Sequence, residues 1–143
     1  DIQIFIATNQ SGIGRGYFSE DDYRVVEGYI EGLFDDRGCP ITQTYYCPFH
    51  PEHGVGKYKK QSHDRKPNPG MILHKIEELG LQPEECAMVG DRLYTDMAMA
   101  TRAGVVGVLV LSGEATIEDV ERLPPDAEQQ PSVVVNSVDD LLR

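Results

Sequence analysis

Short apolar runs alternate with amphipathic segments along the whole chain, and this alternation most constrains the fold. The apolar runs predict strands at residues 2–7, 41–47, 86–91, 105–111 and 132–135. Between them, apolar residues at helical spacing, capping residues and glycines predict helices after Ser19, from Pro69 to Leu79, Thr95 to Ala103, Thr116 to Leu123, and after Ser137. Buried strands that alternate with helices favour a parallel sheet covered on both faces. The sequence therefore predicts an α/β fold.

The length and charge of the chain limit its function. Its 143 residues are typical of one domain, so we expect residues 1–143 to form a single domain. The net charge of −11 argues against nucleic-acid or anionic-membrane partners, which need a basic face. The longest apolar stretches, such as Val105–Leu111, are too short to span a bilayer, and no signal peptide is recognised.

The cysteines and lysines refine this picture. Three irregularly spaced cysteines form no disulfide framework, which predicts a reducing, cytoplasmic location. One basic cluster contains five of the thirteen basic residues within ten positions: Lys57, Lys59, Lys60, Arg65 and Lys66. We expect its first three lysines to be solvated loop residues. A local cluster of this kind leaves room for a small anionic substrate.

Polar residues follow three of the predicted strands, where parallel sheets bind their ligands. Thr8-Asn9-Gln10-Ser11 follows the first strand, Asp64-Arg65-Lys66-Pro67 ends the long loop after the second, and Gly90-Asp91 through Asp96 follows the third. Hydroxyls, a lysine and paired carboxylates are the groups that hold a phosphoryl group with Mg²⁺. The sequence therefore predicts a phosphoryl site.

Each of these residues also has an ordinary structural role open to it. Thr8 and Asn9 are equally consistent with side chains that satisfy a turn. Lys66 is consistent with a surface charge. Asp91 is consistent with a cap on the following helix, and Asp96 with an exposed helical position. The combination and its order favour the phosphoryl site.

Three segments resemble the motifs of the haloacid dehalogenase (HAD) superfamily. They are Thr8–Gly16, Arg65–Met71 and Val89–Asp96, and they are similar to the branch that contains heptose-bisphosphate phosphatase and histidinol-phosphatase. This resemblance implies a Rossmann-like three-layer sandwich with a mostly parallel sheet. It also implies an Mg²⁺-dependent phosphatase that acts through an aspartyl-phosphate.

The resemblance also assigns roles to single residues. The catalytic residues would be Thr8, which bonds the phosphoryl oxygens, Lys66, which stabilises their charge, and Asp91, a ligand of Mg²⁺. Asp96 joins Asp91 at the metal, where it would orient a metal-bound water or the neighbouring lysine. The predicted substrate contacts are Asn9, Ser11, Arg65 and Arg92.

Two departures from the family pattern matter. The nucleophile motif Asp-x-Asp-Gly is absent from these 143 residues, so the resemblance implies an N-terminally incomplete domain without its first, central strand. Many members of this branch also hold zinc in a loop. Here Cys47 remains, but Phe49, Ser62 and Asp64 stand at the other ligand positions. Including His50, His53 and His63, the spacing fits no common zinc pattern, so zinc is not expected.

We therefore predict a phosphatase of a small phosphorylated metabolite, with a sugar (heptose-type) bisphosphate as the preferred substrate. The alternatives are a histidinol-phosphatase, a polynucleotide 3'-phosphatase, and a non-catalytic phosphate-binding protein. We expect no nucleic-acid or membrane partner. We expect the protein to be a monomer or a small homo-oligomer.

Overall fold

The structure is a computed structural model that describes residues 2–142, without the side chain of Leu142. The chain divides after Arg65 into two compact units. Each unit has its own parallel sheet, which confirms the predicted mixed α/β class. No helix in the described range is long and apolar enough to cross a membrane.

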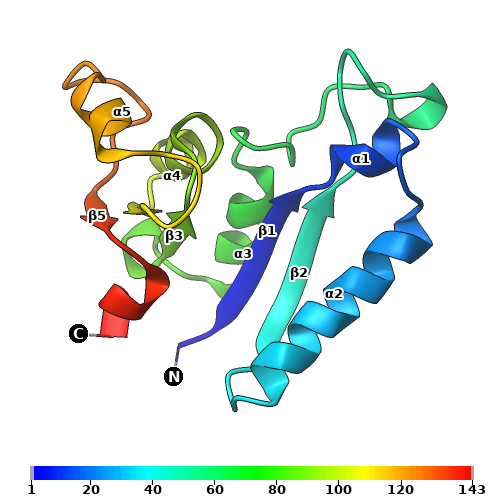
Figure 1. Cartoon of the computed structure of the whole chain (residues 1–143), viewed down its shortest axis with the longest axis horizontal. Helices are drawn as coiled ribbons and strands as arrows, with labels where there is room; N and C mark the ends of the chain where they lie inside the picture. The colour runs from blue at the N-terminus through cyan, green and yellow to red at the C-terminus, as the bar shows by residue number, and fades with distance from the viewer. Residues whose placement is uncertain (1, 143) are drawn as a thin grey trace. The chain divides into compact units, whose positions relative to one another are not determined.

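The first unit contains a two-stranded parallel sheet. Its elements are β1 (Ile4–Asn9), α1 (Ser11–Gly14), α2 (Glu20–Asp35), β2 (Ile41–Cys47) and the 3₁₀ turn η1 (Gly56–Tyr58). β1 pairs with β2, and the long helix α2 runs beside the strands (Figure 1). β1 begins two residues later than predicted and continues to Asn9. Thr8 and Asn9 therefore belong to the end of the strand rather than to a turn after it.

Helix α2 begins and ends where the sequence predicts. The side chain of Ser19 accepts from Asp22 N, and Ser19 N donates to the Asp22 carboxylate, which forms a capping box. Gly38, with φ +71°, follows the helix end. Its predicted apolar face is only partly covered, since Tyr23 is buried but Val26 remains 53% exposed.

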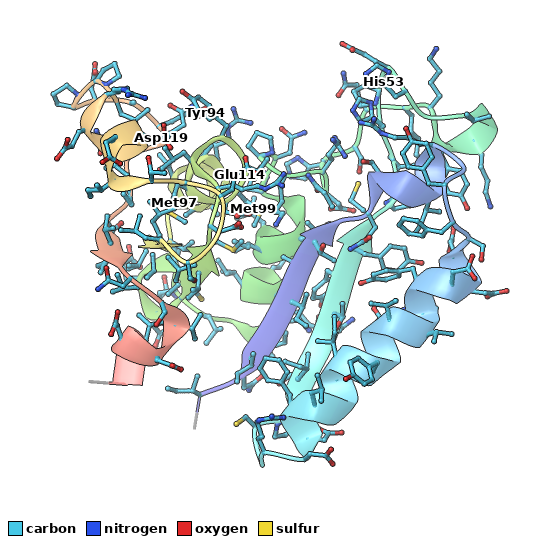
Figure 2. All side chains as sticks on the ribbon, viewed as in Figure 1. His53, Tyr94, Met97, Met99, Glu114 and Asp119 are labelled. Atoms are coloured by element: carbon cyan, nitrogen blue, oxygen red, sulfur yellow. The ribbon has the colours of Figure 1, made fainter. Side chains whose placement is uncertain are left out.

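The second unit is built around a three-stranded parallel sheet in the order β3-β4-β5. Its elements are α3 (Gly70–Leu79), η2 (Pro83–Glu85), β3 (Ala87–Gly90), η3 (Leu93–Met97), α4 (Ala98–Ala103), β4 (Val106–Val110), α5 (Ile117–Glu121), β5 (Val133–Val135) and η4 (Val138–Leu142). Its core contains Met97, Met99 and Leu109, all almost completely buried. The two methionines are labelled in Figure 2.

Most helix ends of the second unit also follow from the sequence. Thr116 forms a capping box with Asp119, and Gly80 and Gly104 end their helices in the left-handed conformation. Two details differ. Pro69 precedes α3 as its N-cap instead of being its first residue. The helix predicted from Thr95 begins earlier, with the π-helical turn Leu93–Met97 that leads into α4.

Among the residues that the structure describes, no strand of one unit forms a ladder with a strand of the other. Within residues 2–142, β1 has only β2 as a ladder partner and β3 has only β4. Each of these two strands therefore keeps one edge without a ladder partner in that range. A central strand between them, as the family resemblance implies, stays a prediction.

Candidate functional site

A buried ion pair lies beyond the carboxyl end of β3 in the second unit. Lys66 Nζ lies 2.8 Å from Asp96 Oδ1, with the two side chains 14% and 4% exposed. The other carboxylate oxygen of Asp96, Oδ2, accepts from Arg92 N at 3.2 Å. The suggestion that Asp96 is an ordinary exposed helical residue is therefore wrong.

The backbone around Asp96 is shaped to admit its carboxylate. The carbonyl of Arg92 accepts from both Asp96 N and Met97 N, which produces the wide π-helical turn of η3. Gly90 lies against Asp96, and a Cβ at position 90 would overlap Cβ and Oδ2 of that side chain. A residue larger than glycine at position 90 would thus displace the partner of Lys66.

Asp91 is held by the segment that follows β4. Its Oδ2 accepts from Glu114 N at 3.0 Å, and its carbonyl accepts from Ala115 N at 3.0 Å. A Cβ at Gly113 would overlap Cβ and Oδ2 of Asp91, so glycine is required for this close approach. The N-cap of the following helical turn is Arg92, without a side-chain cap, so the capping role considered for Asp91 is wrong.

The two carboxylates differ in their capacity to bind a cation. Asp91 uses Oδ2 for Glu114 N, and its Oδ1 accepts no hydrogen bond among the residues described. Both oxygens of Asp96 are already occupied by Lys66 and Arg92 N. Mg²⁺ prefers carboxylate oxygens and usually binds one or two of them together with substrate phosphate. The donor set therefore fits Mg²⁺ at Asp91, while the geometry favours the lysine-orienting role for Asp96.

Arg92 lies beside this cluster on the surface. Its guanidinium pairs with Glu114 at 2.6 Å, and both side chains are more than half exposed. Exposed pairs of this kind contribute little to stability, so the pair opens at small cost. A hollow of about 270 Å³ adjoins Arg92 and is bordered by Tyr94, Glu114 and Asp119, which Figure 2 labels.

Thr8 lies at the carboxyl end of β1 in the first unit, where Gln10 holds its hydroxyl. Gln10 Nε2 donates to Thr8 Oγ1 at 3.1 Å. Since Thr8 Oγ1 accepts this bond, its own hydrogen remains available to donate to a ligand oxygen. The backbone of Gln10 is fixed in turn by a 2.8 Å bond from its N–H to the carbonyl of Cys47. Gln10 was not among the predicted site residues, although it lies in the same motif as Thr8.

The other two predicted residues of this segment lie beside Thr8 in the chain. Asn9 is the last residue of β1 and pairs with Cys47 in the ladder. Ser11 begins α1, and its carbonyl accepts from Arg15 N at 2.9 Å. The first unit thus brings Thr8, Asn9 and Ser11 to one end of its sheet.

Two arginines of the first unit lack an acidic partner within the described range. Arg65 Nη1 donates to the carbonyl of Phe49 at 3.1 Å. Burial and the nearby charge of Arg15 lower the pKa of Arg65 from its ordinary value. Nε of Arg15 is buried without a hydrogen-bond partner. Guanidinium groups without an acidic partner are suited to an anionic ligand. Arg15 was not among the predicted site residues.

The loop after Cys47 is held by hydrogen bonds of its own. His50 N donates to the carbonyl of Tyr58, and Gly54 N donates to the carbonyl of His50. Nδ1 of His50 accepts from Glu52 N and His53 N, so this ring nitrogen serves the turn. Among residues 2–142, no three His, Cys, Asp or Glu side chains gather as a structural zinc site would need. The expected absence of zinc stays a prediction.

Comparisons with known proteins define the class of this chain. The HAD-hydrolase-like family matches residues 63–141. D-glycero-beta-D-manno-heptose-1,7-bisphosphate 7-phosphatase from Pasteurella multocida is 39% identical over 139 residues, which cover 96% of this chain and 71% of that protein. The chain belongs to the HAD-like hydrolase family.

Further relatives and solved structures agree with this class. D-glycero-alpha-D-manno-heptose-1,7-bisphosphate 7-phosphatase from Burkholderia mallei is 45% identical over 106 residues, 74% of this chain and 56% of that protein. A HAD-like phosphatase structure from Mesorhizobium loti has 34% identity to this chain and a TM-score of 0.77. The match covers 99% of this chain and 64% of the Mesorhizobium loti chain. The structure of D,D-heptose 1,7-bisphosphate phosphatase from B. bronchiseptica, solved with magnesium and phosphate, has the same fold, with 24% identity and a TM-score of 0.77. The match covers 98% of this chain and 74% of the B. bronchiseptica chain.

Proposed function

We propose that the protein is an Mg²⁺-dependent phosphatase that hydrolyses a small phosphate monoester, with a heptose-type sugar bisphosphate as its substrate. The buried Lys66–Asp96 pair beside the glycine-cradled Asp91 is the observation that carries this proposal. Arranging an ammonium and a cation-binding carboxylate at one strand end is a way to stabilise the charge of a phosphoryl group in transfer.

The residues of the second unit would have distinct roles at the phosphoryl group. Lys66 would donate to the phosphoryl oxygens, and Asp96 would hold its ammonium in place. Asp91 would ligate Mg²⁺ through Oδ1, while Glu114 N fixes Oδ2. When bound, the cation supplies charge neutralisation at the phosphate oxygens. The motif Asp-x-Asp-Gly, which supplies the nucleophilic aspartate in this family, does not occur in these 143 residues.

The residues of the first unit would bind the phosphate ester. Thr8, with its hydrogen left available by Gln10, donates to a phosphoryl oxygen. Asn9, Ser11 and Arg65 would contact the substrate. Arg92, in the second unit, is a further proposed substrate contact, and its exposed pair with Glu114 would have to open for that role. These assignments rest on the position of each residue in the family motifs.

The substrate class rests on the relatives. Two of them, from Burkholderia mallei and Pasteurella multocida, are named as heptose-1,7-bisphosphate 7-phosphatases. A cytoplasmic location is part of the proposal, and three free cysteines are consistent with it. We further propose a monomer or small homo-oligomer that binds neither nucleic acid nor membrane.

A phosphate-release screen tests the proposal. Protein expressed from its complete gene would be assayed with heptose 1,7-bisphosphate, histidinol phosphate and a 3'-phosphorylated oligonucleotide, with Mg²⁺ or with EDTA. We expect release from the heptose bisphosphate only when Mg²⁺ is present. Faster release from either of the other substrates would replace the proposed one. Binding of phosphate esters without any release would indicate a non-catalytic phosphate-binding protein.

A further inference from the structure

A hollow lies in the first unit whose lining includes none of the residues assigned above. It encloses about 480 Å³ between the N-terminal end of α2, the end of β2 and the loop that follows β2. Its wall includes three aromatic rings, two lysines and one carboxylate: Tyr46, Phe49, Tyr58, Lys57, Lys60 and Glu20. Cavities that bind small molecules occupy roughly 300–1,000 Å³, so this one has room for a phosphorylated monosaccharide.

One part of the lining is a fixed set of hydrogen-bonding oxygens. Tyr58 OH donates to Glu20 Oε1 at 2.6 Å, and Tyr46 OH donates to Oε2 at 2.9 Å. These two bonds lower the pKa of Glu20, which keeps its carboxylate ionised. The ring of Tyr46 is fixed in turn by Tyr23, at 4.7 Å between centroids. Tyr46 OH already accepts from Arg24 Nη2 at 3.4 Å, whereas the carboxylate oxygens retain lone pairs that can accept from ligand hydroxyl groups.

The other part of the lining is cationic. Lys60 Nζ lies 4.0 Å from the ring centroid of Phe49, and Lys57 Nζ lies 4.9 Å from that of Tyr58. Neither ammonium forms an ion pair within the part of the chain that the structure describes. Both lysines are exposed, as expected for solvated loop residues, and each also stands over an aromatic ring beside the hollow. Two ammonium groups beside a hollow attract an anion, and phosphate accepts from lysine as from a point charge.

We infer that this hollow binds a phosphorylated sugar, with the phosphate against Lys57 and Lys60 and the sugar hydroxyls facing the Glu20 carboxylate. Aromatic rings supply the apolar surface for the C–H face of a sugar, and the fixed acceptors match its hydroxyl hydrogens. An apolar ligand would displace water from the Glu20 carboxylate and offer no hydrogen-bond donor in its place. The inference rests on the proposed function and deepens it, since this phosphate would be the one that is not hydrolysed.

Binding titrations test the site directly. Protein expressed from its complete gene would be titrated with heptose 1,7-bisphosphate and with heptose 7-phosphate, in EDTA to prevent turnover. The sequence contains seven tyrosines and no tryptophan, so tyrosine fluorescence reports on a site lined by Tyr46 and Tyr58. The variants are the double change Lys57→Ala/Lys60→Ala and the single change Lys59→Ala. Lys59 is the matched control, because it lies between the two lysines and does not line the hollow.

The proposed site should discriminate between the bisphosphate and the monophosphate, and removal of its two lysines should abolish that discrimination. Wild-type protein should bind the bisphosphate about tenfold more tightly than the monophosphate, as two charge-assisted bonds at an exposed rim would provide. Lys57→Ala/Lys60→Ala should remove this difference, and Lys59→Ala should keep it. Equal affinities in wild-type protein, no binding at all, or the same loss in Lys59→Ala would each overturn the inference.

Restoring Mg²⁺ to the same samples separates this inference from the proposed function. Preferential binding of the bisphosphate without phosphate release would refute the phosphatase and leave the sugar-phosphate site standing. Phosphate release without preferential binding would refute the site and leave the phosphatase standing.

Discussion

Replacing Asp96 by asparagine should destabilise the protein far more than loss of an ordinary ion pair. The substitution preserves shape but removes the charge that compensates Lys66, whose side chain is only 14% exposed. Breaking a buried pair by removing one partner costs about 3–5 kcal/mol. Because the asparagine oxygen still accepts a hydrogen bond, we expect about 3 kcal/mol, or a decrease of about 6–12 °C in melting temperature at this chain length.

Urea denaturation followed by circular dichroism measures this effect, and two controls interpret it. Glu128→Gln removes the carboxylate of the exposed Arg102–Glu128 pair and should change the stability little, because exposed ion pairs contribute little. Asp91→Asn replaces a charge-assisted backbone hydrogen bond by a neutral one and should cost about 1 kcal/mol. If Asp96→Asn unfolds at the same urea concentration as Glu128→Gln, the reasoning about burial is refuted.

A double-mutant cycle isolates the cause of the destabilisation. Adding Lys66→Met to Asp96→Asn removes the ammonium that faces position 96, so the double variant should be more stable than Asp96→Asn alone. The coupling between the two positions should be about 2 kcal/mol, at the upper range for residues in direct contact. Additive losses would mean that Asp96 stabilises the protein through Arg92 N and the π-helical turn instead of through Lys66.

Three further predictions concern activity, metal and pH. In protein expressed from its complete gene, Lys66→Ala and Asp91→Asn should each reduce turnover by about 10²–10³-fold, because each removes charge stabilisation at the phosphoryl group. Lys59→Ala should leave turnover unchanged. Equal losses of turnover in all three variants would contradict the proposed site. Elemental analysis should find no stoichiometric zinc, because the loop after β2 is held by hydrogen bonds; one tightly bound equivalent would overturn this. Burial and the charge of Glu27 raise the pKa of Tyr23 to about 12, from an ordinary value of 10. The unfolded chain therefore loses this proton first, so the free energy of unfolding should fall as the pH rises from 10 towards 12, and Tyr23→Phe should reduce that fall in alkaline denaturation.

Local signals determined the order and ends of the secondary structure. Ser19 and Thr116 each form the predicted cap with an acidic residue three positions later, and Gly80 and Gly104 end their helices with positive φ. These features depend on neighbours within one turn, so sequence alone reveals them. The period of the apolar residues likewise determined the parallel α/β class.

The apolar pattern of α2 did not predict which of its side chains are buried. Val26 stands on the predicted core face and is 53% exposed, because periodicity identifies a face but not what covers it. The wide turn of η3 was also missed. It depends on two N–H groups that share the carbonyl of Arg92, and no residue type signals that arrangement.

The candidate site was predicted as a set of residues, and only the tertiary structure decided their roles. Asp96 lies thirty residues from Lys66 in the chain, and burial against that lysine distinguishes it from Asp91. Tyr58 reaches Glu20 across thirty-eight residues, so no local pattern predicts the hollow that they line. A motif selects residue types that are able to do chemistry. Which oxygen of each carboxylate is already engaged, and which ammonium lacks an ion-pair partner, depends on contacts between distant segments.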